Sequence, residues 1–176
     1  MAQLREKIGR RVVVPQDWID RYEDTRAVNR VQVYEDKGGG FGEEDSYFVK
    51  EAYRGANLIE LELKVSGEVR QLRIDPAFGP CAVKLREVTW NGEAVPLSRR
   101  KLLYANGRIS FPARGEEGSC PSIVFPTEDP GLCIRLEKLP RQMPRQAENI
   151  LRARMEIVRM PLSMAEDLAG GRLLRN

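Results

Sequence analysis

Hydrophobic and polar residues alternate along much of the middle of the chain. Between residues 59 and 65 every second residue is aliphatic, and the residues between them are glutamate or lysine. The same alternation recurs over residues 71–75, 123–125 and 134–136. This period of two is typical of strands with one buried and one solvated face. Several such strands without intervening helices predict a mainly β fold, an antiparallel β-sandwich of the jelly-roll kind.

Turn residues separate these strands. Asn91-Gly92 and Asn106-Gly107 each predict a two-residue hairpin turn, because asparagine and glycine tolerate positive φ angles. Ser66-Gly67 predicts a turn that brings the preceding strand back into residues 69–75. The apolar positions on either side of Arg86-Glu87 are out of phase, which predicts a β-bulge there if both sets point inward.

A helical period replaces the strand period after residue 141. One face of a 3.6-residue helix would carry Ala147, Ile150, Leu151, Met155 and Val158. Pro161 is expected to end this helix, and SMAE at residues 163–166 has the pattern of a capping box for a short second helix. We therefore expect an N-terminal arm (residues 1–28), a β-sandwich domain (29–140) and a helical tail (141–176).

The apolar stripe of the expected tail helix must be buried against something. One interpretation packs it on the sandwich or on a second copy of the chain. The other makes it the start of a coiled coil or of a linker to a further domain. About one and a half heptads cannot sustain a coiled coil alone, so we favour docking or homo-oligomer formation.

Composition and charge exclude several kinds of function. The chain has no histidine, which excludes Ser-His-Asp and Cys-His catalysis and histidine metal sites. Its three cysteines show no Cys-x-x-Cys spacing, which argues against zinc and disulfides and favours a reducing, cytoplasmic location. No apolar run approaches the roughly 18 residues of a membrane span. Residues 141–176 contain seven arginines without an interleaved aromatic residue, so a nucleic-acid partner is not expected.

A glycine-rich loop follows the strand that carries Tyr34 and Asp36. The loop contains Phe41, and three acidic residues at 43–45 come soon after it. Together with Asp36, these acids have the oxygen chemistry of a calcium site, although their spacing does not match an EF-hand. The other interpretation is a tight loop in which Phe41 is a plug and the acids are solvated. We favour the tight loop and predict no metal or cofactor, with calcium as the open alternative.

Two strands end in an Asp-Pro pair. Asp75-Pro76 follows Arg73, which lies on the same strand face and can pair with Asp75. Asp129-Pro130 ends a later strand in the same way. A polar ligand site at the rim of the sheet and a structural Arg/Asp corner both fit this pattern, and we favour the corner.

Aromatic residues are candidates for sugar binding, because a pyranose has an apolar face and a rim of hydroxyl groups. The candidates are Trp90, Tyr34, Tyr47, Tyr53 and Tyr104, with Trp18 in the expected arm. Two carboxylates in one cleft would make a glycosidase, but the sequence does not supply their separation. We predict no catalytic residue in this chain.

The order of these clusters resembles an accessory β-sandwich module of bacterial surface-polysaccharide glycosyltransferases, which also accompanies methyltransferases of glycan assembly. The matching stretches are QVYEDKGGGFGEEDS at residues 32–46, LRIDP at 72–76 with WNG at 90–92, and the segment 125–136 that contains TEDP. The resemblance covers roughly residues 30–140 and departs at Lys37 and Gly42, where small hydroxyl residues are usual. It implies a jelly roll similar to carbohydrate-binding modules, without the catalytic domain, whose βαβ alternation and DxD motif the chain lacks.

We therefore expect a non-catalytic carbohydrate-recognition or scaffolding module that accompanies a bacterial glycosyltransferase. The expected ligand-binding residues are Tyr34, Asp36, Phe41, Arg73, Asp75 and Trp90. The aromatic rings would stack on a sugar, while Arg73 and the acids would bond its hydroxyl groups. The alternative is a protein–protein assembly module without a sugar ligand, which dimerises or docks through its C-terminal helix.

Overall fold

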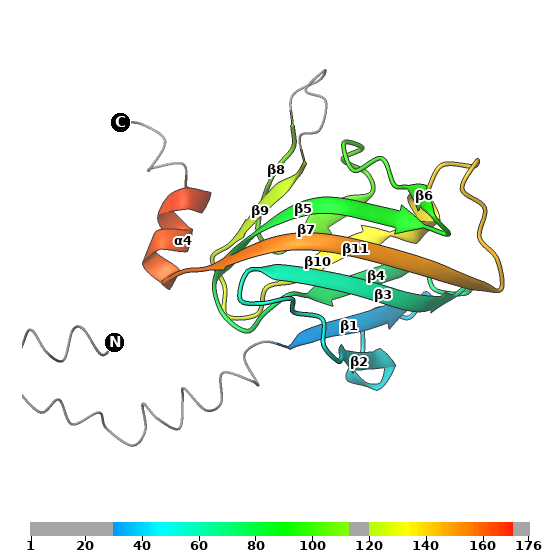
Figure 1. The fold of residues 1–176 in the computed structure, drawn as a ribbon, viewed down its shortest axis with the longest axis horizontal. Coiled ribbons are helices and arrows are strands. Elements are labelled where there is room, and N and C mark those ends of the chain that lie inside the picture. Colours follow the sequence, from blue (N-terminus) through cyan, green and yellow to red (C-terminus); the bar gives the residue numbers. More distant parts are fainter. Residues whose placement is uncertain (1–29, 113–119, 171–176) are drawn as a thin grey trace, which may run out of the picture.

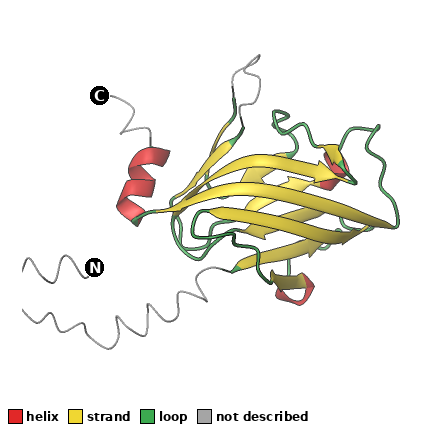
Figure 2. Cartoon of the chain, viewed as in Figure 1, coloured by secondary structure: helices red, strands yellow, loops and turns green. Residues whose placement is uncertain are grey.

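The computed structural model describes residues 30–112 and 120–170, which form two antiparallel sheets packed face to face (Figure 1, Figure 2). Sheet A has the strand order β2-β1-β4-β10-β7, and sheet B has the order β3-β11-β5-β9-β8 with β6 paired to β5. The strands of sheet A are β1 (Val31–Asp36), β2 (Ser46–Val49), β4 (Gln71–Asp75), β7 (Leu103–Ala105) and β10 (Leu132–Arg135). Those of sheet B are β3 (Leu58–Ser66), β5 (Cys81–Trp90), β6 (Glu93–Ala94), β8 (Arg108–Ser110), β9 (Ser122–Phe125) and β11 (Glu148–Arg159).

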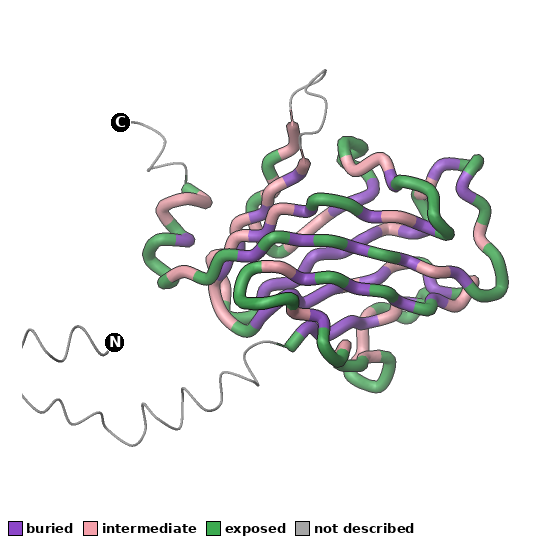
Figure 3. Tube along the Cα trace, viewed as in Figure 1, coloured by how far each residue is buried: buried purple, intermediate pink, exposed green. Residues whose placement is uncertain are grey.

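The core lies between the two sheets and is built by the alternation seen in the sequence. Buried and exposed residues alternate along β3 and β11 (Figure 3). The predicted antiparallel β-sandwich with a C-terminal helix is confirmed, and that helix is α4 (Leu162–Ala169). Two short 3-10 helices, η1 (Glu43–Asp45) and η2 (Leu136–Lys138), lie in the connections.

The predicted bulge and the first hairpin are confirmed. The register of β5 against β11 shifts at Arg86, which has no partner across the strand pair. The bulge lets the apolar residues on both sides of it face the core. Asn91 and Gly92 both have positive φ and join Trp90 to Glu93 in the next strand, as a type I′ turn requires.

The second predicted hairpin is wrong, because β7 belongs to sheet A and β8 to sheet B. Asn106 uses its side chain to bind another loop: it donates to the carbonyl oxygen of Asp129 (2.6 Å) and accepts from the amide of Gly131 (2.8 Å). A Cβ atom on Gly107 would lie 2.4 Å from a backbone oxygen of β9, so close packing requires this glycine. Ser66-Gly67 likewise leads from sheet B to sheet A, so the strands on its two sides do not form a hairpin.

The helix predicted over residues 147–158 is also wrong, because this stretch is strand β11. The strand pairs with β3 on one side and β5 on the other, and it lies inside sheet B. The apolar residues that it buries at every second position are Leu151, Ala153, Met155 and Ile157. Pairing with two neighbours overrides the helix propensity of its residues. The sandwich therefore continues past the expected end at residue 140 as far as Arg159.

The short second helix is confirmed as α4, but it begins differently from the prediction. Pro161 is the N-cap residue, no side chain caps the helix, and the capping box expected at residues 163–166 is not formed. The N-terminal arm at residues 1–28 and Trp18 within it lie outside the described residues. Among the residues that are described, no helix is long and apolar enough to cross a membrane.

Candidate functional site

The outer face of sheet A, which points away from sheet B, carries most of the candidate residues. The strand register places Tyr34, Arg73, Cys133 and Tyr104 in one row across β1, β4, β10 and β7. Apart from Glu35, their neighbours along each strand belong to the core or pack against it. Four adjacent strands about 4.8 Å apart therefore present a row of aromatic, guanidinium and thiol groups.

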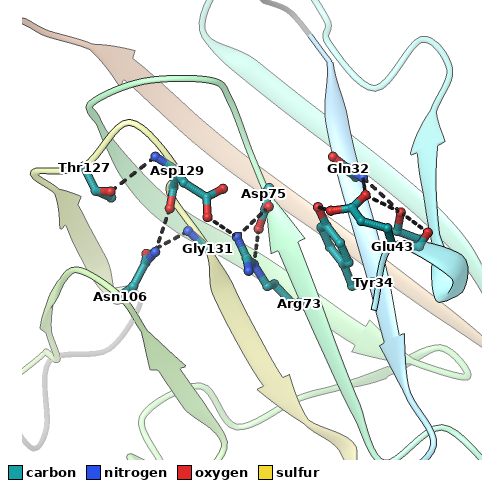
Figure 4. Close-up of polar contacts among 10 residues, drawn as sticks. Gln32, Tyr34, Glu43, Arg73, Asp75, Asn106, Thr127, Asp129 and Gly131 are labelled. Atoms are coloured by element: carbon teal, nitrogen blue, oxygen red, sulfur yellow. Dashed lines mark hydrogen bonds and ion pairs between the residues drawn. The ribbon is translucent and has the colours of Figure 1, made fainter. Parts of the chain in front are cut away.

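Arg73 is the centre of this face (Figure 4). Its Nε donates to Oδ1 of Asp75 (2.7 Å), and its Nη2 donates to Oδ2 of Asp75 and to Oδ2 of Asp129 (2.8 Å each). The guanidinium also lies 5.1 Å from the ring centroid of Tyr34. The two Asp-Pro corners therefore meet through one arginine, and the ion pair that we favoured from the sequence is present.

Asp75 is a buried carboxyl whose side chain faces several charges. Burial raises its pKa to about 6, the hydrogen bonds and charge of Arg73 oppose this rise, and Asp129 and Glu43 add to it. Desolvation thus outweighs the ion pair, as it does for many buried charges. The carboxyl of Asp75 consequently titrates closer to neutral pH than an exposed aspartate.

Tyr34 is also nearly buried, and its hydroxyl group is already bound. The hydroxyl donates to Oε1 of Glu43 (2.9 Å), while Gln32 donates to Oε2 of Glu43 (3.2 Å) and to Ser46 (2.9 Å). Burial, followed by the hydrogen bond to Glu43, raises the pKa of Tyr34 to about 12. The ring therefore supports Arg73 and anchors η1, and it offers little open surface.

Asp36 organises the glycine-rich loop. Its Oδ1 accepts from the amides of Gly38 (2.6 Å) and Gly40 (2.9 Å), and both glycines have positive φ. Phe41 is half-buried in the same loop. The acidic side chains do not converge: no group of three that could hold a metal ion exists among the described residues. This arrangement is the tight loop that we favoured from the sequence.

Trp90 does not belong to this face. Its side chain is 1% exposed in the core between the sheets, and its Nε1 donates to the carbonyl oxygen of Pro144 (3.3 Å). A ring in this position cannot stack on a ligand, so the structure separates Trp90 from the other five predicted residues. Tyr53 is bound to the carbonyl oxygen of Pro76, and Tyr47 is exposed on β2.

The sequence did not single out Arg135, Gln71 or Asn106 as site residues, and it pointed to Glu43 only as a candidate calcium ligand. The guanidinium of Arg135 lies 4.6 Å from the ring centroid of Tyr104, and both side chains are half-buried. Gln71 pairs with Arg135 across β4 and β10. The register between paired strands is what brings such residues together. That register is set by strands that lie far apart in the sequence, so local patterns do not reveal it.

Cys133 lies in the same row but has no nucleophilic character. It is 4% exposed, and burial raises the pKa of its thiol. The neutral thiol is therefore the form at neutral pH, and a reactive cysteine needs the thiolate.

A hollow lies on the outer face of sheet B. It is a groove of about 530 Å³, and its walls carry cross-strand ion pairs such as Arg152–Glu62 (2.8 Å) and Arg154–Glu60 (3.6 Å). None of the residues predicted to bind a ligand lines this groove, and its lining contains no aromatic residue. Without a ring for a sugar to stack on, it is the weaker candidate.

Comparisons of this chain with protein-family models, with curated proteins and with solved structures return no match.

Proposed function

We propose that this chain is a non-catalytic carbohydrate-recognition module and that the outer face of sheet A is its binding face. The observation that carries the proposal is the row from Tyr34 through Arg73 to Tyr104, flanked by Arg135 and Gln71. Guanidinium and amide planes offer paired donors to adjacent sugar hydroxyls, and a tyrosine ring offers an apolar surface with a polar tip.

The residues of this face are buried to different extents, and this difference assigns them two roles. Tyr34 and Asp75 are nearly inaccessible, so they position Arg73. The half-buried side chains of Arg73, Tyr104 and Arg135 are those that a sugar would contact. Because Asp75 and Asp129 already hold Arg73, less side-chain entropy is lost on binding. With so few contacts we expect micromolar to millimolar affinity.

The resemblance to an accessory module of bacterial glycosyltransferases supports the same proposal. In that setting the module would hold a glycan close to the enzyme, or act as a scaffold for it, in the cytoplasm. The partners that we propose are therefore a glycan and a glycosyltransferase catalytic domain.

A glycan array followed by calorimetry tests this proposal. We expect one class of glycan to bind the wild-type chain and the Tyr104→Ala and Arg135→Ala variants to bind it at least tenfold more weakly. Arg152→Ala is the matched control, because it removes an exposed arginine from the outer face of sheet B. Absence of binding at millimolar sugar, or equal weakening by Arg152→Ala, would contradict the proposal.

A second candidate function is assembly through α4, and exposed apolar side chains favour it. Val158, Leu162 and Met164 are 56%, 41% and 47% exposed around the start of this helix. Burial of such residues is the usual driving force for association. If this candidate is correct, sedimentation velocity detects a dimer or a larger species that Leu162→Asp abolishes. A monomer at every concentration would rule out self-association through α4.

A further inference from the structure

The outer face of sheet A carries opposite charges at its two ends. At one end, three carboxylates gather around Arg73 and Tyr34 (Figure 4), namely those of Asp75, Asp129 and Glu43. At the other end, the strand register places Gln71 of β4 beside Arg135 of β10. The residues around this second end are mostly basic.

We call this second end the basic end. It consists of Arg135 and of exposed residues just before β4 and β7, namely Arg70, Arg99, Arg100 and Lys101. The segment before β7 belongs to this end, because the backbone amide of Arg135 donates to the carbonyl oxygen of Leu102 (2.8 Å). Among the described residues, no acidic side chain forms an ion pair with any of these five cations. A group of unpaired cations creates a positive potential that attracts anionic ligands.

Arg135 differs from Arg73, although both guanidinium groups lie over a tyrosine ring. Arg73 lies 5.1 Å from the ring centroid of Tyr34 and is held by two carboxylates. Arg135 lies 4.6 Å from the ring centroid of Tyr104, and its guanidinium donates no hydrogen bond to any residue in the described part of the chain. Half-burial removes part of the hydration of this cation without supplying a counter-charge. The donors of Arg135 are therefore available to a ligand.

The acidic residues near the basic end do not neutralise it. The carboxylate of Asp36 already accepts from two amides of the glycine-rich loop and from Nε2 of Gln71 (3.3 Å). Glu137 contacts Lys138 (3.9 Å), and Glu68 is exposed in the turn before β4. Since five cations face these three acids, the basic end keeps an excess of positive charge.

We propose that the glycan bound by this face is acidic and that Arg135 binds its oxyanion, a carboxylate or a phosphate. A guanidinium offers two parallel N–H donors that match either group. The ring of Tyr104 packs against the apolar face of the same sugar, and the exposed cations before β4 and β7 attract the ligand over a longer range. This inference rests on the proposed carbohydrate binding and names the class of glycan.

Matched pairs of glycans test this inference by calorimetry on the whole chain. The probes are oligosaccharides of glucuronate, galacturonate and mannuronate with their methyl esters, and hexose 6-phosphates with their parent hexoses. We expect one acidic class to bind at least tenfold more tightly than its neutral counterpart at about 50 mM salt, and screening should reduce this ratio at about 500 mM salt. The class that shows the preference, uronate or phosphate, identifies the oxyanion.

Two variants that each remove one charge locate the effect. Arg135→Gln keeps a planar amide but loses the charge, so the affinity ratio of acid to neutral glycan should fall to within twofold of one. Arg152→Gln is the matched control: it removes an exposed arginine from the outer face of sheet B and should keep the full ratio. Unchanged NMR signals of β11 in Arg135→Gln would show that the sandwich remains folded.

The outcomes distinguish this inference from the carbohydrate proposal on which it rests. Equal binding of the acids and their neutral counterparts on the outer face of sheet A would overturn the inference alone. An acid preference that survives Arg135→Gln would do the same. Binding of no glycan in the panel would overturn both.

Discussion

Replacing Arg73 by methionine removes the cation that holds Asp75. The carboxylate of Asp75 is 6% exposed and accepts two hydrogen bonds from this guanidinium. After the replacement, the buried carboxylate must either remain without its cation or take up a proton. The methionine retains most of the aliphatic packing, so the change tests mainly the charge.

Proton uptake sets an upper limit to the pH-dependent loss of stability. The folded wild-type pKa of Asp75, about 6, lies one unit below pH 7, so protonating the folded-state carboxylate there costs about 1.4 kcal/mol at 1.36 kcal/mol per unit. At pH 5 the same group is already mostly protonated in the folded wild-type chain, and the cost nearly vanishes. We therefore expect Arg73→Met to lose up to about 1.4 kcal/mol more at pH 7 than at pH 5.

The free energy of unfolding of the wild-type chain should also depend on pH through the carboxyl group of Asp75. The folded-state pKa of Asp75, about 6, is above its unfolded value of 3.8. Its contribution to stability is therefore fully present below pH 3.8 and is lost as the pH rises through about 6. NMR of the carboxyl carbon should show a titration midpoint near pH 6.

Urea unfolding at pH 5 and pH 7 measures the free energies. Arg86→Met is the control, because Arg86 pairs with Glu156 at the surface, and we expect it to cost less than about 1 kcal/mol. In an Asp75→Asn background the cost of Arg73→Met should mostly disappear. Equal losses at both pH values, or a loss below about 1 kcal/mol at pH 7, would refute the reasoning.

Two further substitutions test the packing. Asn149→Ala should lower the free energy of unfolding by about 2–3 kcal/mol in urea titrations, since Asn149 is fully buried and its side chain bonds Asn91, Gln146 and Val65. A loss no larger than that of exposed Asn57→Ala would contradict this. Gly107→Ala should cost about 2 kcal/mol, because its Cβ would lie 2.4 Å from a backbone oxygen, whereas Gly39→Ala has open space and should change stability by less than about 0.5 kcal/mol in the same assay.

Local patterns predicted the strands and turns whose geometry depends on their own residues. The alternation in β3, the bulge at Arg86 and the Asn91-Gly92 turn are of this kind. β11 is different, because its sequence fits a helical period and a strand period together. Pairing with the neighbouring strands β3 and β5 makes this segment a strand. These two strands lie up to about 100 residues away in the chain.

In the candidate site too, some contacts follow from the local sequence and others depend on segments that are distant in the chain. The pairing of Arg73 with Asp75 follows from their positions on one strand and is confirmed. The contribution of Asp129 depends on a loop that crosses to the same corner, and the contact of Arg135 with Tyr104 depends on the register of β10 with β7. Trp90 was misassigned because position at a strand end says nothing about which side of the sheet a ring occupies.

The most direct test of the carbohydrate-recognition proposal is a ¹⁵N–¹H NMR titration of the whole chain with a panel of glycans at millimolar concentration. We predict that one class of glycan shifts the amide signals of Gln71, Arg73, Tyr104 and Arg135, on the outer face of sheet A. Signals that stay unchanged with every glycan, or shifts confined to Arg152 and Arg154 in the groove of sheet B, would contradict it.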